Sequence, residues 1–221
     1  MEQKLDIGEC IRFGWTTFKT RPWYFIGVFL LLLIVQSVFR FPTLGKQHDV
    51  SAVPIYFLLF VVSFIVSVVV DMVLRSFSLQ VHDRPESASI ASAWTPEVVL
   101  RYFGATILVA LSVVVGLFLL IIPGIIFALA LMFTLYIVIE KKVGPIEAMK
   151  ESMRITKGHR MQLLGLALAL IILNIVGVIL VLVGLLVTIP VTMFALAHAY
   201  RIISGTIVST PEETAAVLPA S

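Results

Sequence analysis

The feature that most constrains this fold is an apolar block of about 40 residues that runs from Tyr102 to Glu140. A helix of roughly 20 apolar residues can cross the hydrocarbon core of a bilayer, so the block has the length of two crossings. Pro123 and Gly124 lie near its middle, where a proline without an N–H and a glycine favour a turn. The block therefore predicts two membrane-spanning helices joined as a hairpin.

The composition extends this prediction to the whole chain. Sixty per cent of the 221 residues are hydrophobic and 13% are charged, whereas soluble domains carry about 25% charged residues. So much apolar surface cannot be hidden in one soluble core of this size. We predict an all-α, polytopic membrane bundle with about six transmembrane helices, at about 22–39, 54–74, 99–120, 123–140, 161–182 and 185–204.

A repeated pattern predicts how these helices are paired. "PGIIFALA" begins at Pro123 and "PVTMFALA" begins at Pro190. Together with Pro54, these prolines are predicted to begin the even-numbered helices, because the first helical position needs no N–H donor. We expect three hairpin repeats at about 4–75, 83–141 and 144–205, each preceded by an interfacial amphipathic helix. They form one membrane domain over 1–205, and we expect 206–221 to be a disordered tail.

Two of the expected interfacial helices have distinctive faces. The first carries an apolar stripe, as expected for a helix that lies in the membrane surface; the stripe consists of Ile7, Cys10, Ile11, Trp15 and Phe18. The last, which begins at Pro145, carries Gly144, Ala148, Ser152 and Thr156 at four-residue spacing. Small residues in that pattern let two helices approach closely. We therefore interpret Gly144, Ala148 and Ser152 as a packing face.

The basic residues predict the orientation, because cytoplasmic loops are rich in Lys and Arg. In the six-helix topology, only Arg40 and Lys46 of the 16 basic residues lie on the second side. We therefore expect both termini to be cytoplasmic.

Two carboxylates are candidate functional residues, because a carboxylate inside a membrane span marks a functional site by default. Both Asp71 and Glu140 lie at the predicted cytoplasmic ends of their spans. Arg75 follows Asp71 by one helical turn, and Glu140 adjoins Lys141 and Lys142. We favour ion pairing or interfacial anchoring for both carboxylates, and a ligand or proton role is the alternative.

The last span holds a second polar group, formed by His198, Tyr200 and Arg201. A lone histidine in a span more often makes an interhelical hydrogen bond than binds a ligand, and both interpretations stay open for His198. Asn174, in the middle of its span, is expected to join two helices by a hydrogen bond.

Neither a catalytic set nor a metal-binding set is recognisable in the sequence. The single Cys10 excludes an intramolecular disulfide and a Cys-cluster metal site. The four histidines lack ligand spacing, and we find no nucleophile with a base and no phosphate-binding glycine loop. We expect no enzyme activity, no cofactor, no metal and no nucleic-acid partner.

The stretch from residue 120 to 165 resembles a known family, the YciC-like bacterial inner-membrane proteins. The membrane domain of some glycerophosphodiester phosphodiesterases is related to this family. The residues that carry the resemblance are the Ile122–Ile126 motif "IPGII", Glu140, Gly144, Ala148 and "SMRITKG" from Ser152. The resemblance implies a bacterial multi-pass inner-membrane protein. It carries over no activity, since the catalytic acids and histidines of those phosphodiesterases lie in a separate soluble domain.

Three functions remain open at this stage. The first is a non-enzymatic membrane protein that binds membrane lipids or a protein partner, or organises the membrane. The second is a small transporter or channel, which the nearly apolar spans disfavour. The third is a membrane accessory to a lipid or glycerophosphodiester enzyme, or a membrane enzyme that itself acts on lipid, which ranks last because no catalytic set is visible.

Overall fold

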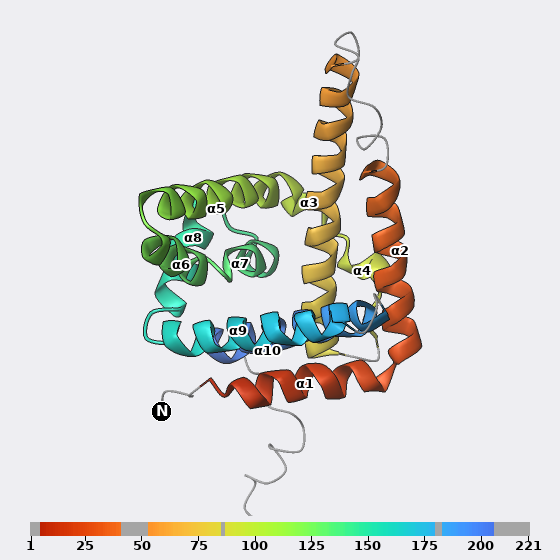
Figure 1. Ribbon diagram of the computed structural model, residues 1–221, viewed down its shortest axis with the longest axis vertical. Coiled ribbons are helices and arrows are strands. Elements are labelled where there is room, and N and C mark those ends of the chain that lie inside the picture. The colour runs from red at the N-terminus through yellow and green to blue at the C-terminus, as the bar shows by residue number, and fades with distance from the viewer. Residues whose placement is uncertain (1–4, 41–52, 85–86, 180–182, 206–221) are drawn as a thin grey trace, which may run out of the picture.

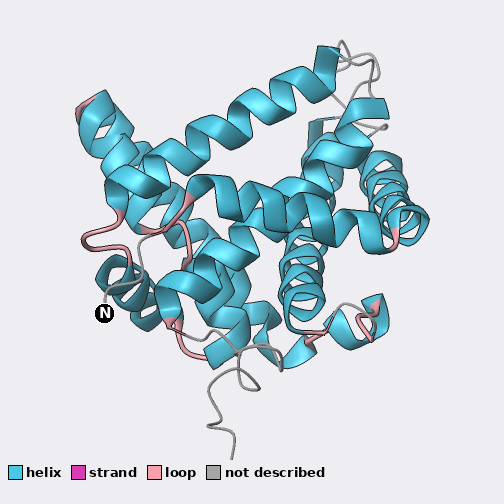
Figure 2. Ribbon diagram, turned by 90° about the horizontal axis from the view of Figure 1, so that it is seen from below, coloured by secondary structure: helices cyan, strands magenta, loops and turns pink. Residues whose placement is uncertain are grey.

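The computed structural model describes residues 5–40, 53–84, 87–179 and 183–205. Every regular element among them is a helix (Figure 2). The helices are α1 (Ile7–Thr20), α2 (Pro22–Arg40), α3 (Val53–Asp83), α4 (Ile90–Ala93), the 3₁₀ turn η3 (Pro96–Val98), α5 (Val99–Leu119), α6 (Ile121–Ala130), α7 (Thr134–Lys141), α8 (Pro145–Ile155), α9 (Arg160–Ile179) and α10 (Val183–Ser204).

The predicted all-helical fold, with helices long and apolar enough to cross a membrane, is confirmed for the described residues. Within the described ranges, five helical stretches are long and apolar enough to cross a membrane: Pro54–Asp83, Ile90–Leu119, Ile121–Lys141, Arg160–Ile179 and Gly184–Ser204. A sixth is possible if α1 and the first part of α2, which meet at a bend of 97°, count as one broken span. The predicted tail at 206–221 and Lys46 lie outside the described residues.

The first helix packs under the bundle. The Asp6 side chain begins α1 by accepting a hydrogen bond of 2.8 Å from the Gly8 N–H, and Pro22 begins α2 after the bend. In Figure 1, α1 lies across the lower end of α2 and beside α10. Its buried residues, which include Cys10, Gly14 and Phe18, pack on protein. The apolar stripe predicted to face lipid therefore contributes partly to the protein core.

Two hairpins turn where glycines allow helices to touch. Only Leu120 separates α5 from α6, and Gly116 faces Gly124 across this turn. In the second hairpin, a Cβ added to Gly184 of α10 would lie 2.3 Å from the Gly177 carbonyl oxygen of α9. Close crossing of the two arms requires the absence of a side chain at these positions.

Three details of the predicted repeat are wrong. Pro190 lies well inside α10 rather than at its start, because the apolar run allows the helix to begin at Val183. The predicted helix at 123–140 is broken into α6 and α7 at residues 131–133. The second interfacial helix is replaced by α4 and η3, since Pro96 and several serines interrupt any longer helix.

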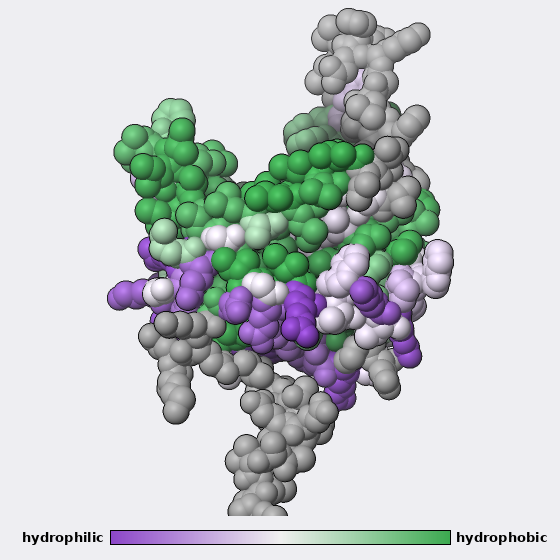
Figure 3. All heavy atoms as spheres, turned by 60° about the horizontal axis from the view of Figure 1, so that its bottom comes forward, coloured by the Kyte–Doolittle hydropathy of each residue, from purple (hydrophilic) through white to green (hydrophobic). Residues whose placement is uncertain are grey.

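The core lies where α3, α5, α7 and α10 meet. Its largest fully buried side chains include Tyr102, Tyr136, Tyr200, Phe77 and Phe194. Hydrophilic residues gather along the lower side of the molecule in Figure 3, and apolar residues cover the upper part. This division and the apolar helices indicate a membrane location.

Candidate functional site

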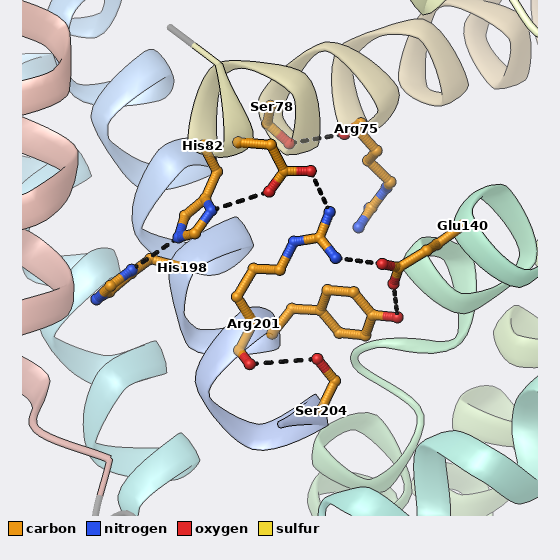
Figure 4. Close-up of polar contacts among 9 residues, drawn as sticks. Arg75, Ser78, His82, Glu140, His198, Arg201 and Ser204 are labelled. Atoms are coloured by element: carbon orange, nitrogen blue, oxygen red, sulfur yellow. Dashed lines mark hydrogen bonds and ion pairs between the residues drawn. The ribbon is translucent and has the colours of Figure 1, made fainter. Parts of the chain in front are cut away.

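Arg201 of α10 joins three helices at the polar end of the bundle. Its side chain is 7% exposed, and one guanidinium nitrogen lies 2.5 Å from the Asp83 carboxylate at the end of α3. Another guanidinium nitrogen donates to the Glu140 carboxylate of α7, and the Tyr200 hydroxyl donates to the other Glu140 oxygen. Figure 4 shows the arginine between its two carboxylate partners. The cluster clamps α3, α7 and α10 together.

The sequence-based interpretation of Glu140 is therefore corrected. Its partner is Arg201, 61 residues further along the chain, and not the adjacent lysines. Lys141 pairs with Glu151 at 2.8 Å, and Lys142 pairs with Glu97 at 2.5 Å. The two lysine side chains point to different elements, because Lys141 is the last residue of α7 and Lys142 follows it in a left-handed backbone conformation with a φ of 52°.

A histidine pair extends the same cluster towards α1. The His82 Nε2 and His198 Nδ1 atoms are 3.0 Å apart, and His82 Nδ1 lies 3.2 Å from Asp83 Oδ1. Phe13 of α1 stacks on the His198 ring, with centroids 4.2 Å apart. If His82 donates from Nδ1 to Asp83, then His198 must donate to His82, which fixes the tautomers of both rings. His198 thus makes the interhelical contact that its position predicts.

A second charged pair lies deeper along α3. Asp71 accepts a hydrogen bond of 3.0 Å from Arg75 Nε, one turn on, and one of 2.6 Å from the Tyr102 hydroxyl. The Arg75 guanidinium lies 5.3 Å from the centre of the Tyr136 ring. The ion pair of Asp71 with Arg75 agrees with the spacing in the sequence, and Tyr102 adds a link to α5.

The surface of α8 carries an ion-pair network of its own. Glu151 lies 2.7 Å from Arg154 and also pairs with Lys141 at the end of α7. Hydrogen bonds from Arg154 and then Lys141 lower the pKa of Glu151 to about 2. Glu151 is therefore charged at neutral pH, and it joins α8 to α7.

The small-residue face of α8 is turned into the protein. Ala148, Ser152 and Thr156 are fully buried. The Ser152 hydroxyl donates a hydrogen bond of 2.8 Å to the Ala130 carbonyl, which α6 leaves free where it ends. Gly144 differs, because a Cβ added there would meet no atom within 4 Å. Ala148 and Ser152 thus form the contact, and Gly144 is not needed for close approach.

Ser152→Ala is expected to lower the free energy of unfolding by about 1 kcal/mol, because it removes the shorter of the two hydrogen bonds to the Ala130 carbonyl. Ser112→Ala is the matched control, since the Ser112 hydroxyl bonds only within its own helix. Denaturant unfolding in detergent would measure both. Equal stability of the two variants would show that the Ser152 hydrogen bond does not hold α8 in place.

A polar pocket opens beside the Arg201 cluster. It has a volume of about 510 Å³ and is lined by Gln80, Asp83, Arg84, Ser87, Ala88 and Ser92. Tyr24 at the start of α2 donates a hydrogen bond of 3.1 Å to the carbonyl of Ala88. Among the described residues, no group of three or more His, Cys, Asp or Glu side chains is placed to hold a metal ion.

Comparison with known families adds one result. The family model described as a domain of unknown function, DUF7847, matches residues 24–214. The chain belongs to the DUF7847 family. The match includes all of α2 except its first two residues and continues through α10, so it includes the Arg201 cluster and the polar pocket. The searches of curated proteins and of solved structures gave no match.

In this DUF7847 protein, sequence reasoning missed part of the site. His82 and Asp83 end a helix that was predicted to stop near residue 74, so neither was considered as a partner. The signal was weak, because the sequence "RSFSL" separates the predicted end of the span from "QVHD" at residues 80–83. Asn174 behaves as predicted and donates a hydrogen bond of 2.8 Å to Thr192 of α10.

Proposed function

We propose that this protein is a non-enzymatic, multi-pass membrane protein that binds a phospholipid headgroup in the polar pocket beside Asp83. The observation that carries the proposal is the chemistry of this pocket. Gln80, Arg84 and Ser87 bring hydrogen-bond donors to it. Arg84 is exposed and has no ion-pair partner among the described residues. Donors and one positive charge suit a phosphate group.

The one carboxylate among the described residues that line the pocket does not oppose this interpretation. Asp83 is already engaged by Arg201 at 2.5 Å and by His82 at 3.2 Å, so its negative charge is largely compensated. The Arg84 guanidinium therefore remains as the positive charge that can bind a phosphate. The same mutual pairing supports a non-enzymatic role, because a general acid or base must be free to exchange a proton with a substrate.

The position of the pocket also favours a lipid. Exposed tryptophans gather at this end of the bundle, with Trp23 84% exposed at the start of α2 and Trp94 48% exposed after α4. Tryptophan is enriched where a membrane protein meets the headgroups. A headgroup in the pocket would therefore leave its acyl chains beside apolar helices.

Native mass spectrometry of the detergent-purified protein tests the proposal. We expect the parent to retain one phospholipid per chain, and Arg84→Ala to reduce the retained fraction several-fold. Lys157→Ala, which removes an exposed charge on the turn after α8, should retain lipid like the parent. A parent without bound phospholipid, or equal retention in Arg84→Ala, would contradict headgroup binding at this pocket.

We also propose that the membrane is the bacterial inner membrane and that both termini are cytoplasmic. The resemblance to YciC-like proteins supports the first, and the distribution of basic residues supports the second. The glycine-lined turns of α5–α6 and α9–α10 support a repeated hairpin design.

A further inference from the structure

The His82–His198 pair lies where three helices meet and is almost closed to solvent. The two side chains, on α3 and α10, are 12% and 14% exposed. Figure 4 shows the two rings facing each other. Phe13 of α1 packs on both, with its ring centroid 4.8 Å from that of His82 and 4.2 Å from that of His198. The pair is therefore part of the surface on which α1 rests.

The pair can accept one proton, but not two, while its rings stay in contact. The His82 Nε2 and His198 Nδ1 atoms are 3.0 Å apart, so only one hydrogen atom can lie between them. With both rings neutral and His82 donating to Asp83, that hydrogen belongs to His198. After one proton is added, one of the two facing nitrogens can still accept. A second added proton puts an N–H group on both, and the rings must separate.

The neighbouring charges compensate a second proton poorly. Asp83 of α3 lies 3.2 Å from His82 Nδ1, and Arg201 of α10 already pairs with its other oxygen. Glu9 of α1 is 4.0 Å from His198 Nε2, which is beyond hydrogen-bond distance, and its side chain is 64% exposed and screened by water. The buried His198 Nε2 atom has no hydrogen-bond partner among the described residues. A second imidazolium would thus be buried beside the first without a close counterion.

We propose that the His82–His198 pair is an acid-sensitive latch, which fastens α1 to α3 and α10 and opens when both rings are protonated. The closed pair binds fewer protons than two separated rings, and histidine in water has a pKa of about 6.5. The latch is therefore intact above that pH and weakens as the pH falls below it. For one proton that only the open form binds, the opening equilibrium rises about tenfold for each pH unit.

Cys10 can report the opening, because it is the one cysteine of the chain and is fully buried on α1. Its rate of reaction with a pyridyl disulfide, which still reacts with thiols in acid, would be measured in detergent at about pH 7 and about pH 5. Each rate is divided by that of the denatured protein at the same pH. We expect this ratio to be about tenfold or more higher at the lower pH. An unchanged ratio would overturn the proposal.

A second buried cysteine separates the latch from general unfolding. Ala105 on α5 is also fully buried, so Ala105→Cys in a Cys10→Ala background is the matched control. The control thiol should stay protected at the lower pH. An equal rise for both thiols would mean that acid unfolds the whole bundle, and the latch would be rejected.

Two substitutions test whether the histidines cause the effect. In His198→Asn an amide nitrogen takes the place of Nδ1, and in His82→Gln one takes the place of Nε2, so each variant can keep a neutral hydrogen bond to the remaining ring. Neither can carry two imidazolium rings, and both should keep Cys10 protected in acid. Acid sensitivity that persists in both variants would refute a role of the pair.

Histidine nitrogen NMR of a protein that keeps both rings provides a test that needs neither variant. With His48 and His159 replaced by glutamine, only the two rings of the pair remain. While Cys10 stays protected, we expect at most one of them to be charged as the pH is lowered. Two charged rings in the protein with a protected Cys10 would contradict the latch.

Discussion

Arg201→Met is expected to lower the free energy of unfolding by about 3 kcal/mol. Removing one member of a buried charge cluster typically costs about 3–5 kcal/mol, because the remaining charges stay buried without a partner. Here Glu140 and Asp83 would both lose Arg201. The lower end of the range applies, since the Asp83 side chain is one third exposed and water can solvate it in part. Denaturant unfolding in detergent micelles would measure the loss.

Two further variants separate charge from packing. Adding Glu140→Gln and Asp83→Asn to Arg201→Met removes the unpaired charges, so this triple variant should recover part of the lost stability. Arg12→Met, at an exposed position of α1, should change stability by less than about 0.5 kcal/mol. If the triple variant is less stable than Arg201→Met alone, the unpaired charges are not the cause of the loss.

Gly14→Ala is expected to cost about 2 kcal/mol by separating α1 from α10. A Cβ at this position would lie 2.5 Å from the Val191 carbonyl oxygen and 3.2 Å from the Ala195 nitrogen. Both contacts are with backbone, which cannot rotate away as a side chain does, so the helices must move apart. Overpacking of this kind costs about 1–3 kcal/mol. Thermal unfolding and protease sensitivity of the N-terminal segment would report it.

Gly27→Ala is the matched control for this prediction. Gly27 lies inside α2, and a Cβ added there would meet no atom within 4 Å. The same substitution should therefore stabilise the protein by about 0.5–1 kcal/mol, because alanine restricts the unfolded chain and favours the helix. A loss of stability in both variants would point to a general effect of replacing glycine and would contradict close packing at Gly14.

The sequence was informative where the structural cause is local. A run of apolar residues long enough to cross a bilayer is a property of one segment, so most of the spans could be predicted within a few residues, although α3 continues nine residues beyond its predicted end. Asp71 and Arg75 are one helical turn apart, and their pairing follows from helix geometry. The buried face of α8 is also local, since Ala148 and Ser152 share it by their spacing.

The central cluster could not be predicted in the same way. Asp83, Glu140 and Arg201 lie on three helices, and their meeting depends on how those helices cross. Periodicity predicts which face of its own helix a side chain occupies. It does not predict which other helix packs against that face. The predicted start of the last span at Pro190 was wrong for a related reason, because it depended on neighbouring helices. Pro190 was treated as a start signal, although a membrane helix tolerates an internal proline where neighbouring groups satisfy the freed carbonyl.

The position of Arg201 in the chain has a consequence for biosynthesis. Asp83 and Glu140 are synthesised before their cation, and α1 is synthesised well before α10, on which its Gly14 rests. While the nascent chain enters the membrane, both carboxylates therefore lack their cation. The buried face of α1 likewise lacks its packing partner until α10 is synthesised. The insertion machinery or the headgroup region must hold the earlier helices during this interval. Completion of α10 closes the fold in one late step.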